Sequence, residues 1–481
     1  MQNIRFKAIV KKGNDRGVGF ISIPIDRRSS FEKNLQIKAI LNLSVEVYAK
    51  IRFYGTLGFY IPYKIMHQNK LKGFINVEIK KIDGFYTSVG SDGRIYIPEK
   101  EAEKLFLENN DILEIKGNVK GIEQTRYPML NVRKKSNNSI DYMCSFDSKL
   151  SGNFGIFSIV RKLKKDTIIE SALQELYCGI IDDETTILYY GNHQPVIINK
   201  NIKFDILSHY LGCYFSDGTK RGNNWGICAS TFEQANYYYL MHHHLIKDSK
   251  IVSNISFTDT DNINVEELIK YLNEAWRNNV KYLSGDVKVR VIKSECKFSL
   301  KTNKFGSLVM KENRKLTQIY YNHLLELLFD EMISSKELAI NFICGVLEGD
   351  GSVSPHLGHL VIATNNRELS LLKEALEHSD IKYNVRIEGE NKSCIHIGLL
   401  EVIRNIGLLK DKIFIYYPKR RKLLKERLLN TASVRFLLGK SSKTSNWLIG
   451  QFNKMGILDG KGHLTEFGIE IQEDLREFLS E

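Results

Sequence analysis

The stretch YLGCYFSDG at 210–218 and a second stretch, ICGVLEGDG at 343–351, follow one pattern. Both are apolar, and both end in Asp-Gly. Each has two small residues four positions apart, which are Gly212 and Ser216 in the first and Gly345 and Gly349 in the second. Residues four apart share one helix face, where small side chains let two backbones approach closely. The pattern predicts two helices that pack through these faces and end side by side at Asp217 and Asp350.

The segments that follow the two stretches are also alike. GICAST at 226–231 and LVIATN at 360–365 are strand-like, and a helical segment follows each, at 233–245 and 367–378. The chain therefore contains a duplicated α-β-β-α unit. Duplication favours a shared role for the two stretches over two unrelated helices that happen to end in Asp-Gly.

Paired aspartates at the ends of two packed helices indicate a metal site. Two buried carboxylates held close together repel, so each prefers to be neutral. A divalent cation between Asp217 and Asp350 would reverse that preference, and Mg²⁺ commonly takes only one or two protein carboxylates with water as co-ligand. Such a metal can activate water and stabilise the departing oxygen of a phosphodiester.

The two motifs resemble those of single-chain LAGLIDADG homing endonucleases, and the resemblance covers residues 196–430. It implies an α+β fold with a duplicated, pseudo-symmetric αββαββα arrangement. The first half would span 196–335 and the second 336–430, and their two sheets would straddle the DNA major groove. The activity implied is Mg²⁺-dependent, site-specific cleavage of both DNA strands.

Carried over by position, the resemblance implies that Asp217 and Asp350 are the catalytic, metal-binding acids. It also implies that the backbone carbonyls of Ser216 and Gly349 join the coordination. Phe215 and Glu348 stand where the family has the first aspartate of its motif, a position that varies. Both final acids are retained, which favours cutting over a non-cutting descendant.

The family also places polar and lysine side chains around the metal-bound water. At the strand ends the polar candidates are Ser230, Thr231, Thr364 and Asn365. The lysine candidates are Lys304 or Lys311 in the first half and Lys412 or Lys419 in the second. The alternative for each lysine is an ordinary solvated side chain.

Three consecutive histidines at 242–244 do not predict a metal site. Consecutive helix residues point about 100° apart, so the three rings cannot all face one ion. The run lies on a helix that we expect to cover a sheet.

The charge of the chain points to a polyanionic partner. Its 481 residues include 69 Lys and Arg against 56 Asp and Glu, a net charge of +13. Such an excess favours nucleic acid, and we expect double-stranded DNA. Cations are dense at 411–443, where those predicted to contact DNA are Lys412, Lys419, Arg420, Arg421 and Lys422. Contacts to phosphates would add salt-dependent affinity, although a charge run is usually a solvated face.

The last part of the chain, 431–481, resembles a winged helix-turn-helix. Residues 443–454 would form the recognition helix with Ser442 as its N-cap, and the glycine-rich segment at 456–465 would form the wing. The alternative is a small helical tail with one glycine hairpin.

A β-rich region of internal repeats is predicted at 1–120. Ile-Pro phrases at 21–24, 59–62 and 95–98 each follow a glycine turn, a pattern typical of hairpins that end at a proline. The third unit resembles the swapped-hairpin barrel of AbrB-type DNA-binding proteins, which implies basic loops presented to DNA. The alternative is any other small β-barrel. Residues 121–195 are predicted to be a linker or connecting region.

The composition excludes several other classes of protein. No two of the seven cysteines form a Cys-x-x-Cys pair, which argues against a zinc ribbon, and no apolar run is long enough to be a signal peptide or a membrane span. We expect a cytoplasmic protein, nucleoid-associated if prokaryotic, with a monomeric catalytic domain and no membrane partner. The Met1 start and the lack of a terminal Cys or Ser argue against a splicing intein.

The favoured function is therefore a Mg²⁺-dependent, site-specific DNA endonuclease of the homing type. A non-cutting DNA-binding regulator that uses the same fold is the main alternative. An RNA splicing maturase is a third.

Overall fold

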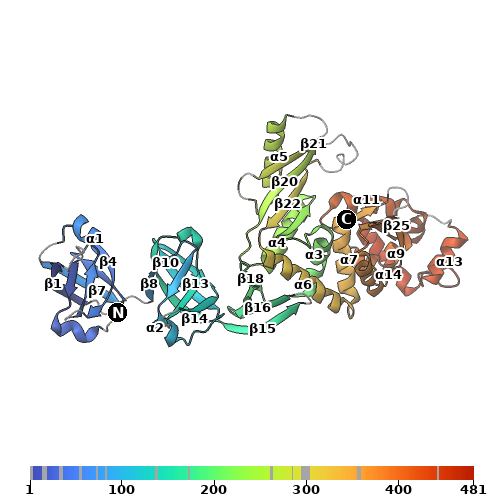
Figure 1. Ribbon diagram of the computed structural model, residues 1–481. Coiled ribbons are helices and arrows are strands. Elements are labelled where there is room, and N and C mark those ends of the chain that lie inside the picture. The colour runs from blue at the N-terminus through green and yellow to red at the C-terminus, as the bar shows by residue number, and fades with distance from the viewer. Residues whose placement is uncertain are drawn as a thin grey trace. The chain divides into compact units, whose positions relative to one another are not determined.

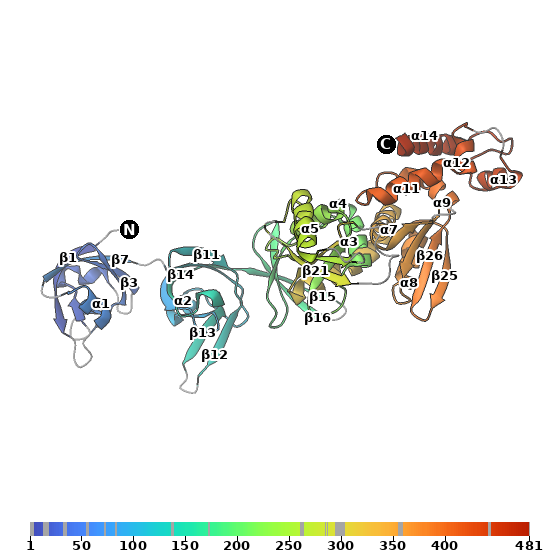
Figure 2. The same cartoon turned by 90° about the horizontal axis from the view of Figure 1, so that it is seen from above.

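The computed structural model describes all residues except 1–3, 13–18, 32–35, 54–56, 72–73, 82–83, 136–138, 172–173, 260–263, 284, 286, 294–303, 355–358, 441–443 and 481. It is a mixed α+β protein with several separate sheets. The chain divides into two units, Met1–Asp166 and Thr167–Glu481. Figures 1 and 2 show the elements of both.

The first unit begins with a seven-stranded sheet in the order β4-β3-β7-β1-β2-β6-β5. Two repeats interleave in it, because β1 and β3 of the first repeat pair with β7 of the second, and β2 pairs with β6. Pro24 and Pro62 are the N-caps of the short helices that follow β2 and β6. The elements are β1 (Ile4–Lys12), β2 (Gly19–Ser22), η1 (Ile25–Ser30), β3 (Gln36–Leu41), β4 (Val45–Lys50), β5 (Arg52–Phe53), β6 (Leu57–Ile61), α1 (Tyr63–Gln68) and β7 (Phe74–Lys81).

A second pair of repeats follows with the same pairing. Strands β8 and β10 both pair with β14, and β9 pairs with β13. Gly93 turns the chain at φ +77°, where a side chain would meet the backbone nitrogen of Ser148. The elements are β8 (Phe85–Ser88), β9 (Arg94–Ile97), α2 (Glu99–Lys104), β10 (Leu113–Val119), β11 (Ile122–Arg126), β12 (Leu130–Lys134), β13 (Ile140–Ser145), η2 (Ser148–Leu150) and β14 (Phe154–Lys162).

The region predicted as a linker at 121–195 is therefore mostly strands. Residues 122–162 supply the fourth repeat, which completes the barrel-like fold begun by the third. Alternation of buried and exposed residues in β14 gives the physical reason, since it faces Phe157 and Gly155 inward. The charged segment at 133–139 begins with the last two residues of β12 and continues to β13, and its residues 136–138 lie outside the described ones. The predicted glycine turns at 17–19 and 55–58 also fall partly outside them.

A four-stranded sheet, β15-β16-β17-β18, leads into the two motif-bearing halves. Its last strand lies against the end of α4, where the backbone nitrogen of Lys247 donates to the carbonyl of Ile197. The strands are β15 (Lys164–Ser171), β16 (Gln174–Ile180), β17 (Thr185–Tyr189) and β18 (Val196–Asn199).

Each half then has one motif helix and one four-stranded sheet. The sheets have the orders β19-β22-β20-β21 and β23-β24-β26-β25. The first half contains α3 (Phe204–Asp217), β19 (Trp225–Ala229), α4 (Phe232–Leu245), β20 (Val252–Asp259), α5 (Val265–Asn279), β21 (Lys288–Lys293), β22 (Ser307–Glu312) and α6 (Lys315–Met332). The second contains α7 (Lys336–Asp350), β23 (Gly351–Val353), β24 (Leu360–Thr364), α8 (Leu369–His378), β25 (Tyr383–Gly389), β26 (Lys392–Ile397), α9 (Leu399–Arg404) and α10 (Ile406–Leu409).

The first half departs from the duplicated arrangement that the sequence predicts. Helix α5 and strand β21 are inserted between β20 and β22, and β21 runs parallel to β20 at the outer edge of the sheet. The strand that would correspond to β23 is reduced to a single bridge between Gly218 and Ile227. The insertion has a signal in the sequence, because Leu268, Leu272 and Trp276 recur every four residues and are buried.

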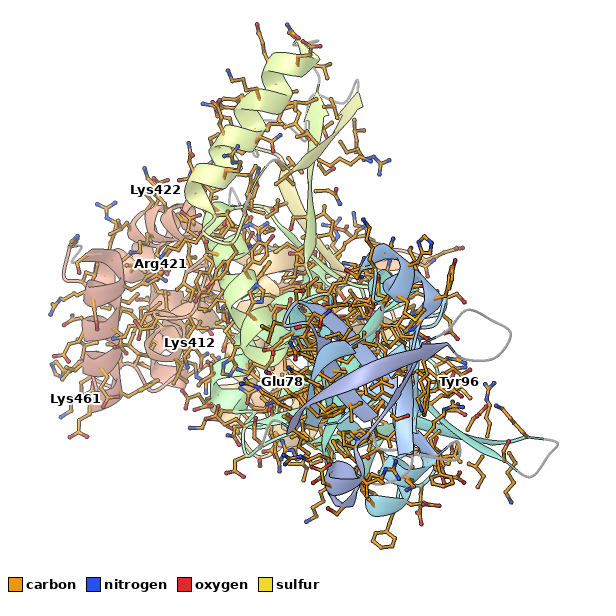
Figure 3. The ribbon with its side chains drawn as sticks, turned by 90° about the vertical axis from the view of Figure 1, so that its left-hand side faces the viewer. Glu78, Tyr96, Lys412, Arg421, Lys422 and Lys461 are labelled. Atoms are coloured by element: carbon orange, nitrogen blue, oxygen red, sulfur yellow. The ribbon has the colours of Figure 1, made fainter. Side chains whose placement is uncertain are left out.

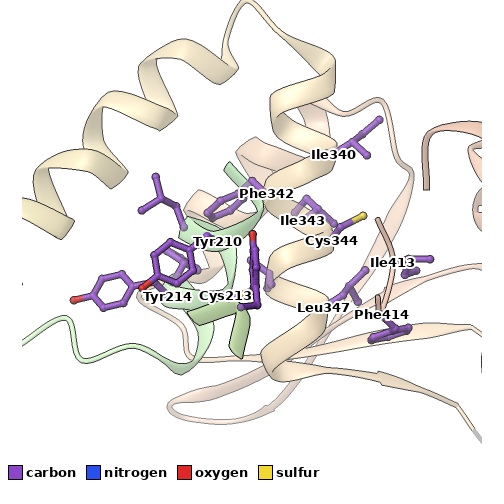
Figure 4. Packing of buried hydrophobic residues seen from close by; sticks show 14 of the residues in the cluster. Tyr210, Cys213, Tyr214, Ile340, Phe342, Ile343, Cys344, Leu347, Ile413 and Phe414 are labelled. Atoms are coloured by element: carbon purple, nitrogen blue, oxygen red, sulfur yellow. The ribbon is translucent and has the colours of Figure 1, made fainter. Parts of the chain in front are cut away.

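Side chains of α3 and α7 form the centre of the larger core. Tyr210 and Tyr214 from α3 and Phe342 and Leu347 from α7 are fully buried (Figure 4). The ring of Phe215 packs on that of Phe342 at 5.3 Å between centroids. This packing holds the ends of the two helices in one place.

The C-terminal segment is helical and packs on the second half. It consists of α11 (Pro418–Leu429), α12 (Ala432–Leu437), α13 (Asn446–Lys454) and α14 (Glu466–Ser480). Lys410 pairs with Asp474 and Glu477 of α14. Within the described residues, no helix has both the length and the apolar character needed to cross a bilayer.

The predicted winged-helix elements are present only in part. Helix α13 begins at Asn446 with Ser445 as its N-cap, whereas the predicted cap, Ser442, lies outside the described residues. The expected wing is a turn closed by one bridge between Leu458 and Leu464, and the long helix α14 follows it without a counterpart in the prediction.

Candidate active site

The motif helices α3 and α7 touch through their glycines. A Cβ atom added at Gly212 would overlap the carbonyl oxygen of Phe342, and one added at Gly345 would overlap the carbonyl oxygen of His209. At the same end as the aspartates, a Cβ on Gly349 would overlap Oγ of Ser216. Backbones this close have no room for side chains, which is why the sequence has small residues on these faces.

Asp217 and Asp350 are the last residues of α3 and α7. Asp217 lies against the other helix, since a Cβ on Gly349 would stand 2.6 Å from its Oδ2. Burial, together with the Asp350 carboxylate, raises the pKa of Asp217 to about 7. Burial also raises the pKa of Asp350. The two carboxylates therefore form one acidic site in which both charged forms are disfavoured.

Two cations stand beside this acidic pair. Lys220 donates to the carbonyl of Phe215 and pairs with Glu368. Arg420 Nη1 donates to the carbonyl oxygens of Leu347, Glu348 and Gly349, at 3.2, 2.8 and 2.9 Å. Both satisfy carbonyls at the C-terminal end of a motif helix, the end that favours positive charge.

The electrostatic effect of these cations opposes that of burial. Lys220 and Arg420 each lower the pKa of both aspartates. Lys220 is not among the residues that the sequence predicts for the site, and Arg420 is predicted there as a DNA contact. A lysine three residues beyond the Asp-Gly helix end is the sequence signal that could identify Lys220.

Glu348 ties the second motif helix to the first half. It is fully buried, its Oε1 accepts the backbone N–H of Tyr416 at 3.0 Å, and its carbonyl accepts Gln234 Nε2 at 3.0 Å. Gln234 Oε1 in turn accepts the backbone N–H of Ser230 at 2.8 Å. Burial raises the pKa of Glu348 to about 7.

The segment around Tyr416 closes the same network. The hydroxyl of Thr231 donates to the Tyr416 carbonyl at 2.6 Å, and the Tyr416 ring stacks on Tyr237 at 3.9 Å. Four residues later the chain reaches Arg420. The position of Arg420 over the end of α7 thus depends on contacts with α4 of the other half.

The remaining polar candidates are held in local contacts. Thr231 is the N-cap of α4, while Thr364 is buried and its hydroxyl donates to the Asn365 carbonyl. Asn365 Nδ2 donates to Glu368, which also pairs with Lys220. Asn365 is therefore linked to the acidic site through Glu368.

Of the two lysines predicted for the first half, Lys311 is connected to the end of α3 through β19. It pairs in register with Gly226 of β19, and the backbone N–H of Thr219, two residues after Asp217, donates to the Gly226 carbonyl. Lys304 lies over the ring of Phe305 instead.

The cations predicted to contact DNA lie in different surroundings (Figure 3). Lys412 pairs with Glu337 in the first turn of α7, the end opposite Asp350. Arg421 Nη1 donates to the carbonyls of Lys410 and Ile413, so it holds the chain rather than facing solvent. Lys419 and Lys422 are exposed.

The three consecutive histidines have separate partners. His242 is fully buried and lies between Tyr321 and Glu312, which also pairs with Arg314. The ring of His243 stacks near Tyr239 and Tyr282, and His244 approaches Asn199. Within the part of the chain that the structure describes, no three His, Cys, Asp or Glu side chains form a group suited to a metal.

Comparisons with known proteins find only low-level structural similarity over part of the chain. No family model matches the chain, and no curated protein matches it. Among solved structures, I-DmoI in complex with DNA and Ca is 13% identical, covers 42% of this chain and 88% of its own, and has a TM-score of 0.22. I-DmoI in complex with DNA and Mn is 13% identical, covers 43% of this chain and 96% of its own, and has a TM-score of 0.26. A mesophilic variant of the homing endonuclease I-DmoI is 12% identical, covers 43% of this chain and 95% of its own, and has a TM-score of 0.22. Similarity at this level does not establish the activity of this chain.

Proposed function

We propose that this chain is a divalent-metal-dependent endonuclease that cuts both strands of DNA at a specific site, as LAGLIDADG homing endonucleases do. One observation supports the proposal most directly. Two helices packed glycine against glycine end together at Asp217 and Asp350, so two acids from separate halves meet at one place.

The residues present fit Mg²⁺. Two carboxylates are the number that Mg²⁺ commonly takes from a protein, with water and substrate phosphates filling its other positions. Gly349 leaves the space beside Asp217 that a side chain would fill. The Gly349 carbonyl, which the resemblance assigns to the metal, already accepts a hydrogen bond from Arg420, so we assign coordination to the carboxylates and leave this carbonyl to Arg420.

Each of these residues would then have its own role. Asp217 and Asp350 hold the cation, which when bound supplies an activated water and stabilises the leaving oxygen. Lys220 and Arg420 fix the ends of the two helices and favour the charged carboxylates, against the effect of burial. Glu368 and Asn365 orient Lys220 from the second half.

DNA would lie along the open faces of the two sheets. Side chains alternate along a strand, so the residues opposite the core face outward. In the first half one cross-strand row starts at Cys228, whose pKa is raised by burial and by the nearby Asp217. The row continues through the register partners Val309 and Asn254 to Lys288.

The inserted strand β21 adds positive charge to this face. Lys288 and Arg290 are both exposed, while Val289 and Val291 between and after them pack against the core. Lys311 on β22 is a third exposed cation of the same face. Among the described residues that alternation places on the open face of the first half's sheet, none is acidic, which favours contact with phosphates.

The remaining domains complete the proposal. The interleaved barrels at 1–162 would act as AbrB-like DNA-binding modules, the halves at 196–335 and 336–430 as the nuclease, and 431–481 as a helical DNA-binding domain. Lys419 and Lys422 are the best placed of the predicted arm to contact DNA. The protein would work beside genomic DNA, with one chain sufficient for catalysis because it supplies both acids.

The test is cleavage of a supercoiled plasmid that carries the genomic flanks of the gene with the insertion point rejoined. We expect linear product with Mg²⁺ and none with EDTA. Asp217→Asn and Asp350→Asn should each abolish it, while Asp330→Asn on α6, an exposed acid away from the site, should cut like the wild type. Cutting that survives in both active-site variants would overturn the assignment.

A non-cutting DNA-binding regulator is the second candidate. The position of Arg420 favours it. The guanidinium donates hydrogen bonds to carbonyl oxygens at the end of α7 and brings positive charge to the proposed metal site. Tight, salt-sensitive DNA binding without cutting, unchanged in both aspartate variants, would support the regulator.

A further inference from the structure

The four-stranded sheet β11-β10-β14-β8 of the first unit has a face that the core does not use. Along β10 the side chains alternate, so Ile115 and Val119 are buried while Lys116 and Asn118 are exposed. Strands β14 and β8 continue the same face. It is directed into a cleft of about 1010 Å³.

Aromatic rings gather on this face. Tyr86 of β8 and Phe154 of β14 stack at 5.4 Å between centroids with 19° between their planes. Tyr48 of β4 stacks on Tyr86 at 4.6 Å and 11°. Phe154 is 58% exposed, which forgoes most of the stabilisation that burial gives a phenylalanine. Tyr48 and Tyr86 are half-buried, so Phe154 is the exposed ring at the end of this stack, and it suits a flat ligand.

Cations line the same cleft. Lys38, Lys116 and Lys120 face it, and Lys38 lies over the Tyr48 ring at 5.7 Å while pairing with Glu46. Among its described lining residues the acid is Glu123. We call Tyr48, Tyr86 and Phe154 with these three lysines the aromatic cleft.

We propose that the aromatic cleft binds a single strand of nucleic acid, with an unpaired base stacked on Phe154, which extends the stack of Tyr48 and Tyr86, and the backbone phosphates near Lys116 and Lys120. Proteins that hold single strands combine a basic groove with aromatic side chains on which successive bases stack. A base pair in a duplex already stacks on its neighbours, so an exposed ring on a sheet favours unpaired bases. This function goes beyond the proposed duplex cleavage and stands without it.

The test measures binding of the full-length protein to fluorescently labelled oligothymidine and, separately, oligouridine. Phe154→Ala should weaken binding about tenfold, because one stacked base contributes ~1–3 kcal/mol. Phe154→Trp should retain binding, since it keeps an aromatic ring on an exposed position. A preference for thymidine would assign DNA as the ligand and a preference for uridine would assign RNA, and either supports the proposal.

Tyr96→Ala is the matched control. Tyr96 is an exposed tyrosine of β9 in the same pair of repeats, and it is not among the residues that line the cleft (Figure 3). It should bind oligonucleotides like the wild type. Affinity for a duplex and the thermal melt should be unchanged in all three variants, which separates this site from the nuclease.

Three results would overturn the proposal. One is equal binding of oligonucleotides by wild type and Phe154→Ala. Another is an equal loss in Phe154→Ala and Tyr96→Ala. The third is no binding of either oligonucleotide by a wild-type protein that cuts or binds duplex DNA, which would leave the proposed nuclease intact and remove this site alone.

Discussion

Gly345 is the residue on which the contact between the motif helices depends most. A side chain there would overlap the His209 carbonyl, and the helix backbones cannot move apart without opening the core around them. We expect Gly345→Ala to destabilise the protein by about 1–3 kcal/mol, the usual cost of overpacking. Chemical unfolding followed by tryptophan fluorescence measures it, because Trp225 lies fully buried in the same core.

Gly450 on α13 gives the control for that substitution. A Cβ at Gly450 meets no atom within 4 Å, and alanine is the better helix former. Gly450→Ala should therefore leave stability equal or raise it by about 0.5–1 kcal/mol. Equal losses in both variants would mean that the glycine faces are not in close contact.

The shared burial of the two acids predicts that the stability of the metal-free protein depends on pH. The pKa of Asp217 is raised to about 7 by burial and by Asp350. Between about pH 4 and 7 the native protein still holds the Asp217 proton, whereas the unfolded chain, with a pKa of about 3.9, has lost it. The metal-free protein should therefore lose stability as the pH rises through this range. Above that window the loss stays constant.

The test compares the melting temperatures of the wild type and Asp217→Asn in EDTA across this pH range. The amide does not titrate, so the melting temperature of the variant should rise relative to the wild type as the pH increases. Adding Mg²⁺ should offset the loss in the wild type only. A difference in melting temperature that is flat from about pH 4 to 7 would contradict the account.

At the scale of one residue, the sequence could predict contacts that backbone geometry dictates. The glycines of α3 and α7 were predictable because only small residues allow helices to touch. Arg420 was not, because its place over the end of α7 depends on where Tyr416 is held by Thr231 and Glu348. Contacts that depend on the path of a loop leave no periodic pattern in the sequence.

The inserted strand β21 makes a prediction at the scale of an element. If Lys288 and Arg290 bind phosphates, replacing both with serine should lower the dependence of log affinity on log salt by about 0.9 for each phosphate that is no longer neutralised. Lys270→Ser with Arg277→Ser removes the same charge from exposed positions on α5 of the same insertion.

Duplex binding measured over a range of salt concentrations distinguishes the two pairs. The β21 pair should flatten the slope by about 2 in total, and the α5 pair should leave it near the wild-type value. Equal slopes in the two variants would mean that β21 contributes only overall charge.

Elements with strong periodicity were predictable, and those defined by partners were not. Both motif helices and the strands after them appear where duplication placed them. The sequence predicts a linker over 121–195. No Ile-Pro phrase marks the fourth repeat at 122–162, and only the pairing of this repeat with β8, β9 and β10 shows that it completes a fold.

The division into two units makes a prediction for the whole molecule. The unit Thr167–Glu481 contains both acids, both flanking cations and both sheets of the motif halves. A chain of residues 164–481, which keeps β15 whole, should therefore still cut DNA with Mg²⁺, but with weaker affinity because the barrels at 1–162 are missing.

Cleavage rates of the full chain and of 164–481 at low and moderate salt measure this. We expect similar rates at saturating protein and a larger loss for the shorter chain as salt increases. A folded 164–481 that binds duplex DNA but cannot cut it would place part of the catalytic apparatus in the first unit.

Mn²⁺ binding tests, without relying on cleavage, whether Asp217 and Asp350 share one divalent cation. Electron paramagnetic resonance can count the Mn²⁺ bound by the wild type, Asp217→Asn and Asp350→Asn, each with duplex DNA. We expect the wild type to bind Mn²⁺ at a site that either single substitution removes, while Asp330→Asn retains it. Unchanged Mn²⁺ binding in both active-site variants would contradict the account.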